Sequence, residues 1–428
     1  MPTFCKISRN PKQKFGEVNT MTKNGQQMLE GIKVLDIGNL LAGPGISKNL
    51  ADFGADVVKV EHPKGGDPSR NWGAKKNGIP LAWKSQSRGK RLLALDINHP
   101  EGQGIIRKLA AKSDVMIENY RPGRLEKWGL GYEKLSEGNP KLILVRVSGW
   151  GQFGPYKDRP GFGTLAEAIS GFAHITGQPD GPPTLPPFGL ADGINAQIGT
   201  WAVMMALYHR DVHNQPGQVI DLAIYESIFS ILGPQPMEYD QLGIIQQRVG
   251  NRSSRGVPRN AYRTSDGRWV AISANSPNIA LRLFKAIGRE DMTTDPRYST
   301  QTARLAHGDE VDGIVANWIG QHSLKDVLNI LIEYEVAIAP VYDIQQIMED
   351  PHCKARGTII QMPDEDLGKI RIPNIVPRLS RTPGRIRYTG KSQIGYDTIE
   401  ILKEIGLQSE EIEKLEKKGV IACKVPNS

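Results

Sequence analysis

The segment "GIKVLDIGNLLAGPGISKNLADFGADVVKVE" (31–61) carries the strongest signal for the fold of this chain. Residues 32–38 are a short run rich in β-branched side chains that ends in glycine, and residues 56–61 form a second such run. Between them, residues 44–55 space their apolar side chains as a helix does. Strand, helix and strand within about 30 residues make one βαβ unit, which brings its two strands into the same parallel sheet.

The same alternation continues through the first 150 residues. Strands are predicted at 91–97, 114–118 and 141–149, with helices at 99–113 and 132–140 between them. Pro100 suits the first turn of a helix, where its missing N–H costs nothing. Predicted strands that are almost continuously apolar are typical of a parallel sheet covered on both faces. We therefore expect an α/β fold whose large domain is built on a Rossmann-like parallel sheet.

The 428 residues are too many for one compact core and predict more than one domain. A Gly- and Pro-rich stretch at 151–187 should form an ordered surface loop, and a strand at 217–224 with a helix at 225–233 returns to the α/β pattern. A strand at 267–274 begins an α+β section, and two short amphipathic helices are predicted within 397–421. The predicted organisation is a disordered polar extension (1–28), the N-terminal part of the large domain (29–244), a small α+β domain (245–345) and a C-terminal part that returns to the large domain (346–428).

The formal net charge of +8 favours anionic partners such as phosphorylated metabolites. No basic run is long enough, or mixed with enough aromatic residues, to indicate nucleic acid, so no nucleic-acid partner is expected. No apolar stretch reaches the roughly 18 residues of a membrane span. Residues 1–26 also lack the apolar core of a secretory signal. We therefore expect no membrane association.

The cysteines, Cys5, Cys353 and Cys423, lie far apart in the sequence and form no pair with metal-ligand or redox spacing. An odd, sparse set suits a reducing compartment, so a cytoplasmic protein is expected. The histidines include no HxxxH or similar pair. No metal site and no permanently bound cofactor are therefore predicted.

The turn after the first predicted strand invites comparison with a dinucleotide-binding fingerprint, because Gly43 and Gly45 precede a helix and Glu61 ends the second strand. Pro44 removes an N–H from this turn, and Lys48 occupies the position of the third glycine. The close-approach and packing roles of those glycines are therefore lost. A nicotinamide oxidoreductase is accordingly the weakest of the alternatives, although a helix N-terminus can still bind a phosphate.

A single carboxylate stands before a long apolar run in "LPPFGLADGINAQIG" (185–199). Asp192 could be a helix N-cap, for which aspartate is a preferred residue. It could equally be a nucleophile, because a helix N-terminus stabilises the ionised carboxylate that attack on a thioester carbonyl requires. Gly189 and Gly193 would let a bulky substrate approach the backbone. The residues alone leave both interpretations open.

Seven motifs, taken together, are specific for one family. They are "VLDIGNLLAGP" (34–44), "GADVVKVEHPKGGDPSR" (54–70), "SRGKRLLALDI" (87–97), "DVMIENYRPGRLEKWGLGY" (114–132), "SGWGQFGPYKDRPGF" (148–162), "SGFAHITGQPDGPPTLPPFGLADG" (170–193) and "GQVIDLAIYES" (217–227). From about Gly31 to Ile421 the chain resembles the class III CoA-transferases, the CaiB/BaiF-like family of formyl-CoA transferase and carnitine CoA-transferase. The resemblance implies an interlaced homodimer and an enzyme that moves CoA from an acyl-CoA to a small carboxylic acid, with succinyl-CoA as one candidate donor.

The resemblance also implies a mechanism, because the aspartate of the family's LADG-like motif is the nucleophile and falls on Asp192. Its attack on the acyl-CoA would give a mixed anhydride, and the returning CoA thiolate would give an aspartyl-CoA thioester that the acceptor acid then takes over. The implied CoA contacts include Arg121 and Lys127, which suit phosphate groups, and His62, which stands where well-known members carry arginine. The full set is Leu41, Ala42, His62, Leu95, Asp96, Ile97, Asn98, Asn119, Tyr120, Arg121, Lys127, Ser148, Gly149, Trp150 and Gly151.

Two alternatives remain beside the transferase. The family includes acyl-CoA racemases, whose acid–base histidine falls in "RPGFG", but this chain has Phe162 there and lacks one of the two bases. The other alternative is a non-catalytic acyl-CoA-binding protein with a vestigial site. The glycine run over the active site of formyl-CoA transferases is replaced by "RSSRGVPRN" (252–260), so formate and oxalate are not expected as substrates. Arg252, Arg255 and Arg259 could instead bind the distal carboxylate of a dicarboxylic acid, or serve a subunit interface or face water.

Overall fold

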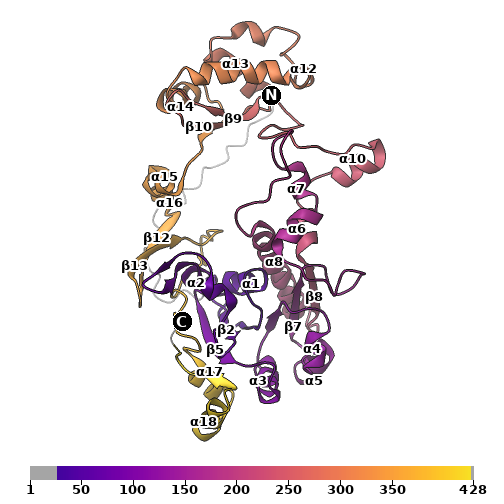
Figure 1. Ribbon diagram of the computed structural model, residues 1–428, viewed down its shortest axis with the longest axis vertical. Helices are drawn as coiled ribbons and strands as arrows, with labels where there is room; N and C mark the ends of the chain where they lie inside the picture. Colours follow the sequence, from indigo (N-terminus) through magenta and orange to yellow (C-terminus); the bar gives the residue numbers. More distant parts are fainter. Residues whose placement is uncertain (1–26, 426–428) are drawn as a thin grey trace, which may run out of the picture. The chain divides into compact units, whose positions relative to one another are not determined.

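The computed structural model describes residues 27–425 (Figure 1), so the predicted extension at 1–28 lies almost wholly outside the described residues. The chain divides into two compact units. Unit 1 holds the described residues up to Ala166, Gly189–Ser227 and the described residues from Pro351 onward, and unit 2 holds Glu167–Phe188 and Ile228–Asp350. Along 27–425, no helix is long and apolar enough to cross a membrane.

The smaller unit is larger than the domain predicted at 245–345, because it also takes in 167–188, 228–244 and 346–350. Two hydrogen bonds explain part of this difference. Gly250 N donates to Gly177 O over 2.9 Å, and Arg248 Nη1 donates to His174 O over 3.0 Å. These bonds tie the Pro-rich segment before Asp192 to the chain that enters the small sheet.

Unit 1 is built on a seven-stranded sheet in the order β14-β5-β2-β1-β6-β7-β8. Six strands are parallel, and β14 pairs antiparallel with β5. Taken in chain order, the parallel strands run 3-2-1-4-5-6, which is the Rossmann order. The predicted α/β fold with a large parallel sheet is confirmed. The strands are β1 (Lys33–Asp36), β2 (Asp56–Glu61), β5 (Lys90–Leu95), β6 (Val115–Glu118), β7 (Ile143–Ser148), β8 (Val219–Ala223) and β14 (Ile421–Ala422).

Helices from distant parts of the sequence complete the core of unit 1. Leu109 of α3, Leu402 of α17 and Leu415 of α18 belong to one buried apolar cluster with Leu35 and Leu93 of the sheet. Figure 1 shows α17 beside β5 at the edge of the sheet and α18 next to α17. The helices of unit 1 are α1 (Ala42–Asp52), α2 (Leu81–Gln86), α3 (Pro100–Ala110), α4 (Arg124–Lys127), α5 (Tyr132–Gly138), α8 (Leu190–Val212), α9 (Ile224–Phe229, beginning in unit 1), α16 (Pro351–Arg356), α17 (Thr398–Glu404) and α18 (Ser409–Lys417).

Helices α1 and α8 pack against each other through glycines. A Cβ atom built on Gly45 would lie 2.7 Å from Ala196 Cβ, and one built on Gly199 would lie 2.3 Å from Ile46 Cδ1. Contacts this short leave no room for a larger side chain at either glycine. The long helix that carries Asp192 is therefore fixed against the first helix of the Rossmann sheet.

Unit 2 contains a three-stranded antiparallel sheet in the order β11-β10-β9, which agrees with the α+β character predicted for this part of the chain. The strands are β9 (Arg259–Arg263), β10 (Trp269–Ser273) and β11 (Ile338–Pro340). Val270 and Ile272 of β10 are buried with Leu283, Val315 and Leu331 from the helices. The helices are α7 (Phe172–Ile175), α10 (Gln235–Leu242), α11 (Pro277–Ala286), α12 (Gln301–Ala306), α13 (Gly308–Gly320), α14 (Leu324–Glu333) and α15 (Ile344–Glu349), with α6 (Gly163–Ile169) beginning in unit 1.

Some elements were not predicted from the sequence. The stretch at 151–187 contains α6 and α7 rather than loop alone. Strand β14 and two hairpins, β3 (Lys75–Lys76) with β4 (Ile79–Pro80) and β12 (Ile359–Asp364) with β13 (Gly368–Pro373), also lie outside the predicted strands. Most of these elements are too short to leave a clear periodic pattern. Two short 3₁₀ turns complete the described elements, at Pro68–Asn71 and Glu290–Thr293.

Candidate active site

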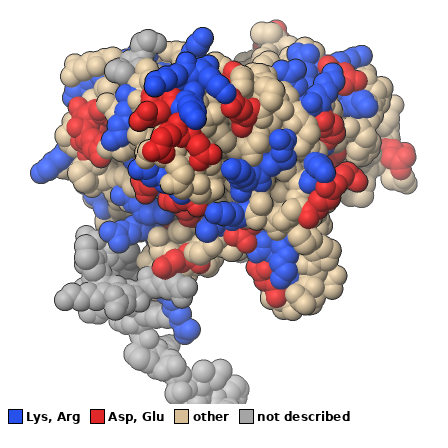
Figure 2. All heavy atoms as spheres, turned by 90° about the horizontal axis from the view of Figure 1, so that it is seen from below, with Lys and Arg blue, Asp and Glu red and all other residues tan. Residues whose placement is uncertain are grey.

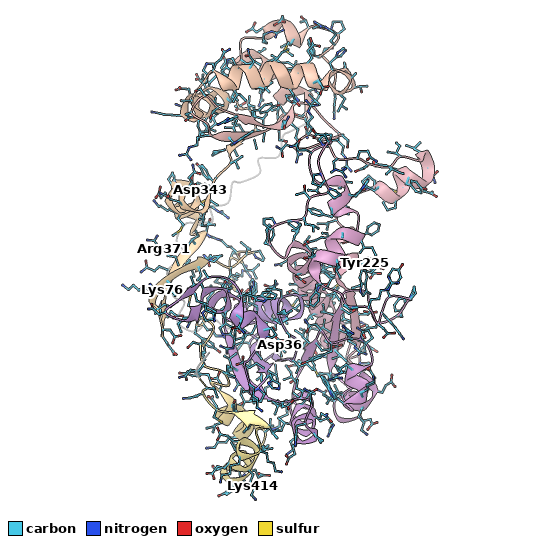
Figure 3. The ribbon with its side chains drawn as sticks, viewed as in Figure 1. Asp36, Lys76, Tyr225, Asp343, Arg371 and Lys414 are labelled. Carbon is cyan, nitrogen blue, oxygen red and sulfur yellow. The ribbon has the colours of Figure 1, made fainter. Side chains whose placement is uncertain are left out.

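A cavity of about 250 Å³ lies at the carboxyl ends of the central strands in unit 1. Asp36 marks the end of β1 in the middle of the sheet (Figure 3). Ligands of open parallel sheets bind outside this edge, at the point where the strand order reverses, which here is between β1 and β6. The lining residues lie at the carboxyl ends of β2 and β5 or follow β1, β2, β5 and β6, and they are Asn39, Val60, Glu61, His62, Leu95, Ile97, Asn98, Tyr120, Arg124 and Trp128.

Several predicted CoA contacts come together at this cavity. Asp96 lies beside it, with its Oδ1 3.9 Å from His62 Nε2. Asn119 Nδ2 donates over 2.7 Å to the carbonyl of the lining residue Asn39. The predicted contacts that line the cavity themselves are His62, Leu95, Ile97, Asn98 and Tyr120.

The other predicted contacts do not line the cavity. Leu41 and Ala42 lie at the start of α1. Arg121 and Lys127 are exposed on the segment that follows β6. Residues 148–151 lie at the end of β7. A single cavity therefore does not account for the whole predicted set.

Two side chains that sequence reasoning missed form one wall of the cavity. The Arg124 guanidinium lies 4.7 Å above the Trp128 ring, and Arg124 Nη2 donates to Asn98 Oδ1 over 3.0 Å. The rings of Trp128 and Tyr120 meet edge to face with centroids 4.9 Å apart. The sequence did contain a signal for this pair: Arg124 and Trp128 are four residues apart, and residues at that spacing lie on the same side of a helical turn. The wall offers an aromatic face together with a cation.

Asp192 lies inside the first turn of α8 and not at the cap. The helix begins at Leu190, and Gly189 is the residue before it, without a side-chain cap. Gly193 N donates to Gly189 O over 3.0 Å, which closes the first turn. The N-cap interpretation of Asp192 is therefore wrong. The half-buried carboxylate still lies at the positive end of the helix dipole.

Backbone from two glycines surrounds the Asp192 carboxylate. A Cβ atom built on Gly163 would lie 2.5 Å from Asp192 Oδ2, and one built on Gly189 would lie 3.1 Å from the same oxygen. The Gly189 position is also 3.0 Å from Leu41 Cδ1. Neither glycine has a left-handed backbone, so the missing side chain is needed here for space. The carboxylate thus lies against backbone at both glycines.

The predicted contacts at 148–151 fix the loop that leads to Gly163. A Cβ atom built on Gly149 would lie 2.6 Å from Gly161 Cα, so the two backbones touch. Trp150 Nε1 donates to Pro160 O over 3.1 Å. Phe162, where the racemases carry their histidine, stands next to Gly163 and has no proton to exchange. The loop thus provides close packing beside Asp192 and no second acid–base group at that position.

Buried charges lie close to the cavity. Burial raises the pKa of Glu118 to about 7, although Arg146 Nε donates to it over 2.8 Å and opposes the shift. Glu118 also accepts from the N–H of the lining residue Tyr120 over 2.7 Å. Burial likewise lowers the pKa of Lys90 to about 8, with Asp36 opposing it. Burial would lower the pKa of Lys59 too, but Asp67 and Asp36 outweigh burial and raise it.

The charges at the surface are mixed in sign. On the face shown in Figure 2, basic and acidic side chains lie among one another rather than in one continuous basic area. Among residues 27–425, no group of three or more His, Cys, Asp or Glu side chains could hold a metal ion.

Two arginines of the 252–260 segment are engaged within unit 2. Arg252 Nε lies 2.6 Å from Asp312 Oδ2, and Arg252 also pairs with Asp309. Arg259 Nη1 donates to the carbonyls of Asn251 and Arg252, over 2.8 Å and 2.9 Å. These contacts hold the loop before β9, and the two ion pairs of Arg252 occupy its guanidinium in this arrangement.

Comparison with known proteins identifies the class. The sequence model described as CoA-transferase family III matches residues 29–398, so the chain belongs to this family. A succinyl-CoA–D-citramalate CoA-transferase from Chloroflexus aurantiacus is 41% identical over 395 residues, which cover 92% of this chain and 98% of that protein. The β subunit of a succinyl-CoA–L-malate CoA-transferase from the same organism is 42% identical over 398 residues, with 92% and 98% covered.

The solved structures agree with the sequence relatives. A CAIB/BAIF family protein from Brucella suis superposes with a TM-score of 0.78 at 29% sequence identity, and 89% of this chain and 100% of that chain are covered. The predicted resemblance is confirmed, and the chain is a CoA-transferase enzyme. CoA thioesters are the substrates that fit this class.

Proposed function

We propose that this enzyme transfers CoA from succinyl-CoA to a dicarboxylic acid of four or five carbons through a covalent intermediate on Asp192. The observation that carries the proposal is the Asp192 carboxylate itself, held in the first turn of α8 against the backbone of Gly163 and Gly189. The named activities of the two Chloroflexus relatives support the donor and the class of acceptor, since both act on succinyl-CoA and a hydroxy dicarboxylate.

The proposed chemistry keeps the thioester bond energy through a sequence of acyl exchanges. An Asp192 oxygen attacks the thioester carbon, the C–S bond breaks, and the products are an aspartyl–succinyl anhydride and the CoA thiolate. The thiolate attacks the aspartyl carbonyl and releases succinate, which leaves an aspartyl-CoA thioester. The acceptor carboxylate then displaces the thiolate, and the thiolate attacks the acceptor carbonyl of the new anhydride. Asp192 is restored as a carboxylate and no water is consumed.

The glycines beside Asp192 suit this chemistry for a steric reason. Each anhydride joins a second acyl group to an Asp192 carboxylate oxygen, and a side chain at position 163 or 189 would occupy part of the space beside that carboxylate. The helix dipole favours the negative charge of the attacking carboxylate. We propose the cavity at the carboxyl ends of the strands as the place where CoA binds, with the predicted contacts around it.

Exchange between succinyl-CoA and a panel of acids tests the proposal. We expect malate, citramalate or glutarate to give a new acyl-CoA together with one succinate per CoA transferred, read by mass spectrometry, while total thioester stays constant. Acetate and formate serve as monocarboxylic controls. Binding of CoA without exchange would favour the binding-protein alternative. Uptake of deuterium at the α-carbon of a branched acyl-CoA would favour the racemase.

Arg124 gives a prediction about CoA affinity. Arg124→Ala removes the cation beside the Trp128 ring, and we expect the dissociation constant for CoA to rise about tenfold, equal to about 1.4 kcal/mol. Calorimetric titration with CoA measures the change. Lys108→Ala, which removes an exposed cation from α3, is the control and should leave the affinity unaltered. If Arg124→Ala and the wild type bind CoA with equal affinity, the proposal that CoA binds in this cavity is wrong.

We also propose a homodimer, which an exposed apolar stripe along α8 supports. Trp201, Met205, Tyr208 and Val212 recur every three or four residues, and each is half or more exposed in the single chain. Exposed apolar stripes of this kind mark protein contacts.

A cytoplasmic location is likewise a proposal, supported by the pattern of cysteines.

Charge placed on the stripe should separate the subunits. For the double variant Trp201→Asp with Met205→Asp, light scattering should give one chain mass of 47.2 kDa, whereas the wild type gives twice that value. Ile399→Asp on α17 is a matched control, since Ile399 is also an exposed apolar residue of unit 1. A wild-type protein that is already monomeric would contradict the proposed dimer.

A further inference from the structure

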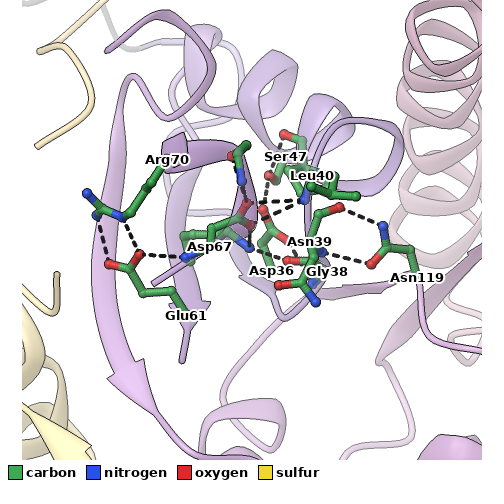
Figure 4. Close-up of polar contacts among 12 residues, drawn as sticks. Asp36, Gly38, Asn39, Leu40, Ser47, Glu61, Asp67, Arg70 and Asn119 are labelled. Carbon is green, nitrogen blue, oxygen red and sulfur yellow. Dashed lines mark hydrogen bonds and ion pairs between the residues drawn. The ribbon is translucent and has the colours of Figure 1, made fainter. Parts of the chain in front are cut away.

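A buried charge cluster lies behind the turn that joins β1 to α1 (Figure 4). It consists of Asp36, Lys59, Asp67 and Lys90, each at most 1% exposed. Lys59 Nζ lies 3.0 Å from Asp67 Oδ2, and Lys90 Nζ lies 3.1 Å from Asp36 Oδ2. The two positive and two negative side chains balance. Such clusters are weak evidence for stability, because desolvating four charges offsets much of their attraction.

The buried charge cluster binds the backbone of the turn at 38–40. Lys59 Nζ donates to the carbonyl of Gly38, and Asp36 Oδ1 accepts from Gly38 N over 3.0 Å. The Asp67 carboxylate accepts from Leu40 N with both oxygens, each at 3.3 Å. Charged side chains therefore bind the N–H and the carbonyl of Gly38 and the N–H of Leu40.

The Asn119 side chain holds the middle of the turn from the other side. Asn39 N donates to Asn119 Oδ1, and Asn119 Nδ2 donates to Asn39 O, both over 2.7 Å (Figure 4). A pair of reciprocal bonds leaves the Asn39 peptide little freedom. The turn is thus fixed from β2, β6 and the loop after β2 together.

The backbone of this turn is strained, and the hydrogen bonds described above stabilise it. Leu40 has a φ of 65°, in the left-handed region that a side chain with a Cβ atom disfavours. Such a residue is strained and persists only where its surroundings determine its conformation. Strain of this kind is often found at functional sites, and here it falls between two parts of the candidate active site.

The residues on either side of Leu40 face those two parts. Asn39 lines the cavity at the carboxyl ends of the strands. Leu41 packs on Gly189, since a Cβ atom there would lie 3.0 Å from Leu41 Cδ1. Gly189 in turn touches the Asp192 carboxylate. Leu40 therefore lies between a residue of the cavity wall and a residue that packs beside Asp192.

We propose that Asp67 and Lys59 are positioning residues for CoA transfer: they hold Leu40 in its left-handed conformation and so align the CoA cavity with Asp192. The inference rests on the proposed function. Neither residue touches the reacting atoms, and each acts through the turn at 38–40.

A double-mutant cycle with Leu40→Gly tests this role. Asp67→Asn should lower kcat/KM for succinyl-CoA about thirtyfold, which corresponds to about 2 kcal/mol. Glycine adopts a positive φ without strain. In the Leu40→Gly background we therefore expect Asp67→Asn to lower kcat/KM less than threefold. The same loss in both backgrounds would overturn the proposal, because a purely structural role of Asp67 would not depend on residue 40.

Two further variants keep the test decisive. Asp52→Asn is the matched control: Asp52 is a buried aspartate of the same unit, paired with Arg88 at 2.6 Å, and its loss should lower stability while KM stays unchanged. If Asp67→Asn does not fold, Lys59→Met replaces it in the same cycle. Calorimetric CoA binding by the four proteins of the cycle gives a second readout. A wild type without exchange would count against the proposed function alone, whereas additive losses in CoA affinity would count against the positioning role.

Discussion

Replacing Asp192 with asparagine is expected to lower kcat for CoA exchange about 1,000-fold or more, with CoA affinity changed less than threefold. The amide keeps the size and shape of the carboxylate but is a poor nucleophile, so the anhydride cannot form. The backbone of Gly163 and Gly189 lies close to residue 192, so only a side chain of the same size and shape fits there. Asparagine has that size and shape.

The covalent intermediate provides the direct measurement. Wild type mixed with succinyl-CoA should yield a peptide containing Asp192 with CoA or succinate attached, and Asp192→Asn should yield none. Asp211→Asn, at the other end of α8, removes an exposed aspartate paired with Arg210 and should exchange CoA at the normal rate. Exchange by Asp192→Asn at the wild-type rate would exclude Asp192 as the nucleophile.

Gly163→Ala should lower kcat about 100-fold, because a displacement of about 1 Å at a reacting group is enough for such a loss. The new Cβ atom would lie 2.5 Å from Asp192 Oδ2, where no real contact is found. The carboxylate or the loop at 161–163 must therefore move. The fold should tolerate the change, because Gly163 does not have a left-handed backbone.

Gly193 offers a matched control one residue after Asp192. A Cβ atom built there meets no atom within 4 Å. Gly193→Ala should keep kcat, and it should stabilise the helix by up to about 1 kcal/mol. Steady-state kinetics and denaturant unfolding of both variants separate the two effects. A normal kcat for Gly163→Ala would show that the close approach at position 163 has no part in catalysis.

The sequence was sufficient for the central fold because βαβ units produce long, regular signals. Strand β2 (Asp56–Glu61) begins and ends where the pattern predicts, and the strands at 91–97 and 141–149 are wrong only by one or two residues at their ends. Strand β14, with two residues, has no pattern of its own, since it is formed by pairing with β5. Such elements depend on tertiary contacts that a local pattern does not contain.

The site was predicted less completely, for two physical reasons. Local sequence could not exclude an N-cap at Asp192, because the position of the cap depends on where α8 begins, and glycine is a less obvious N-cap than aspartate. The buried charge cluster was missed because Lys59 stands in an apolar strand, while its partner Asp67 lies in the following loop. Arg124 and Trp128 became recognisable only when their four-residue turn was placed beside β6.

The contribution of α17, α18 and β14 to the core of unit 1 has a consequence for biosynthesis. Ile401, Ile412 and Ile421 share one buried cluster with Leu35, a residue that the ribosome adds hundreds of positions earlier. Asp397 also accepts from Leu92 N over 2.8 Å, at the strand that β14 will flank. Until the C-terminal segment has been synthesised, the sheet of unit 1 therefore has an open edge at β5, and its leucines lack part of their packing. Incomplete intermediates of this kind expose apolar surface, so the C-terminal segment protects the sheet of unit 1 from aggregation.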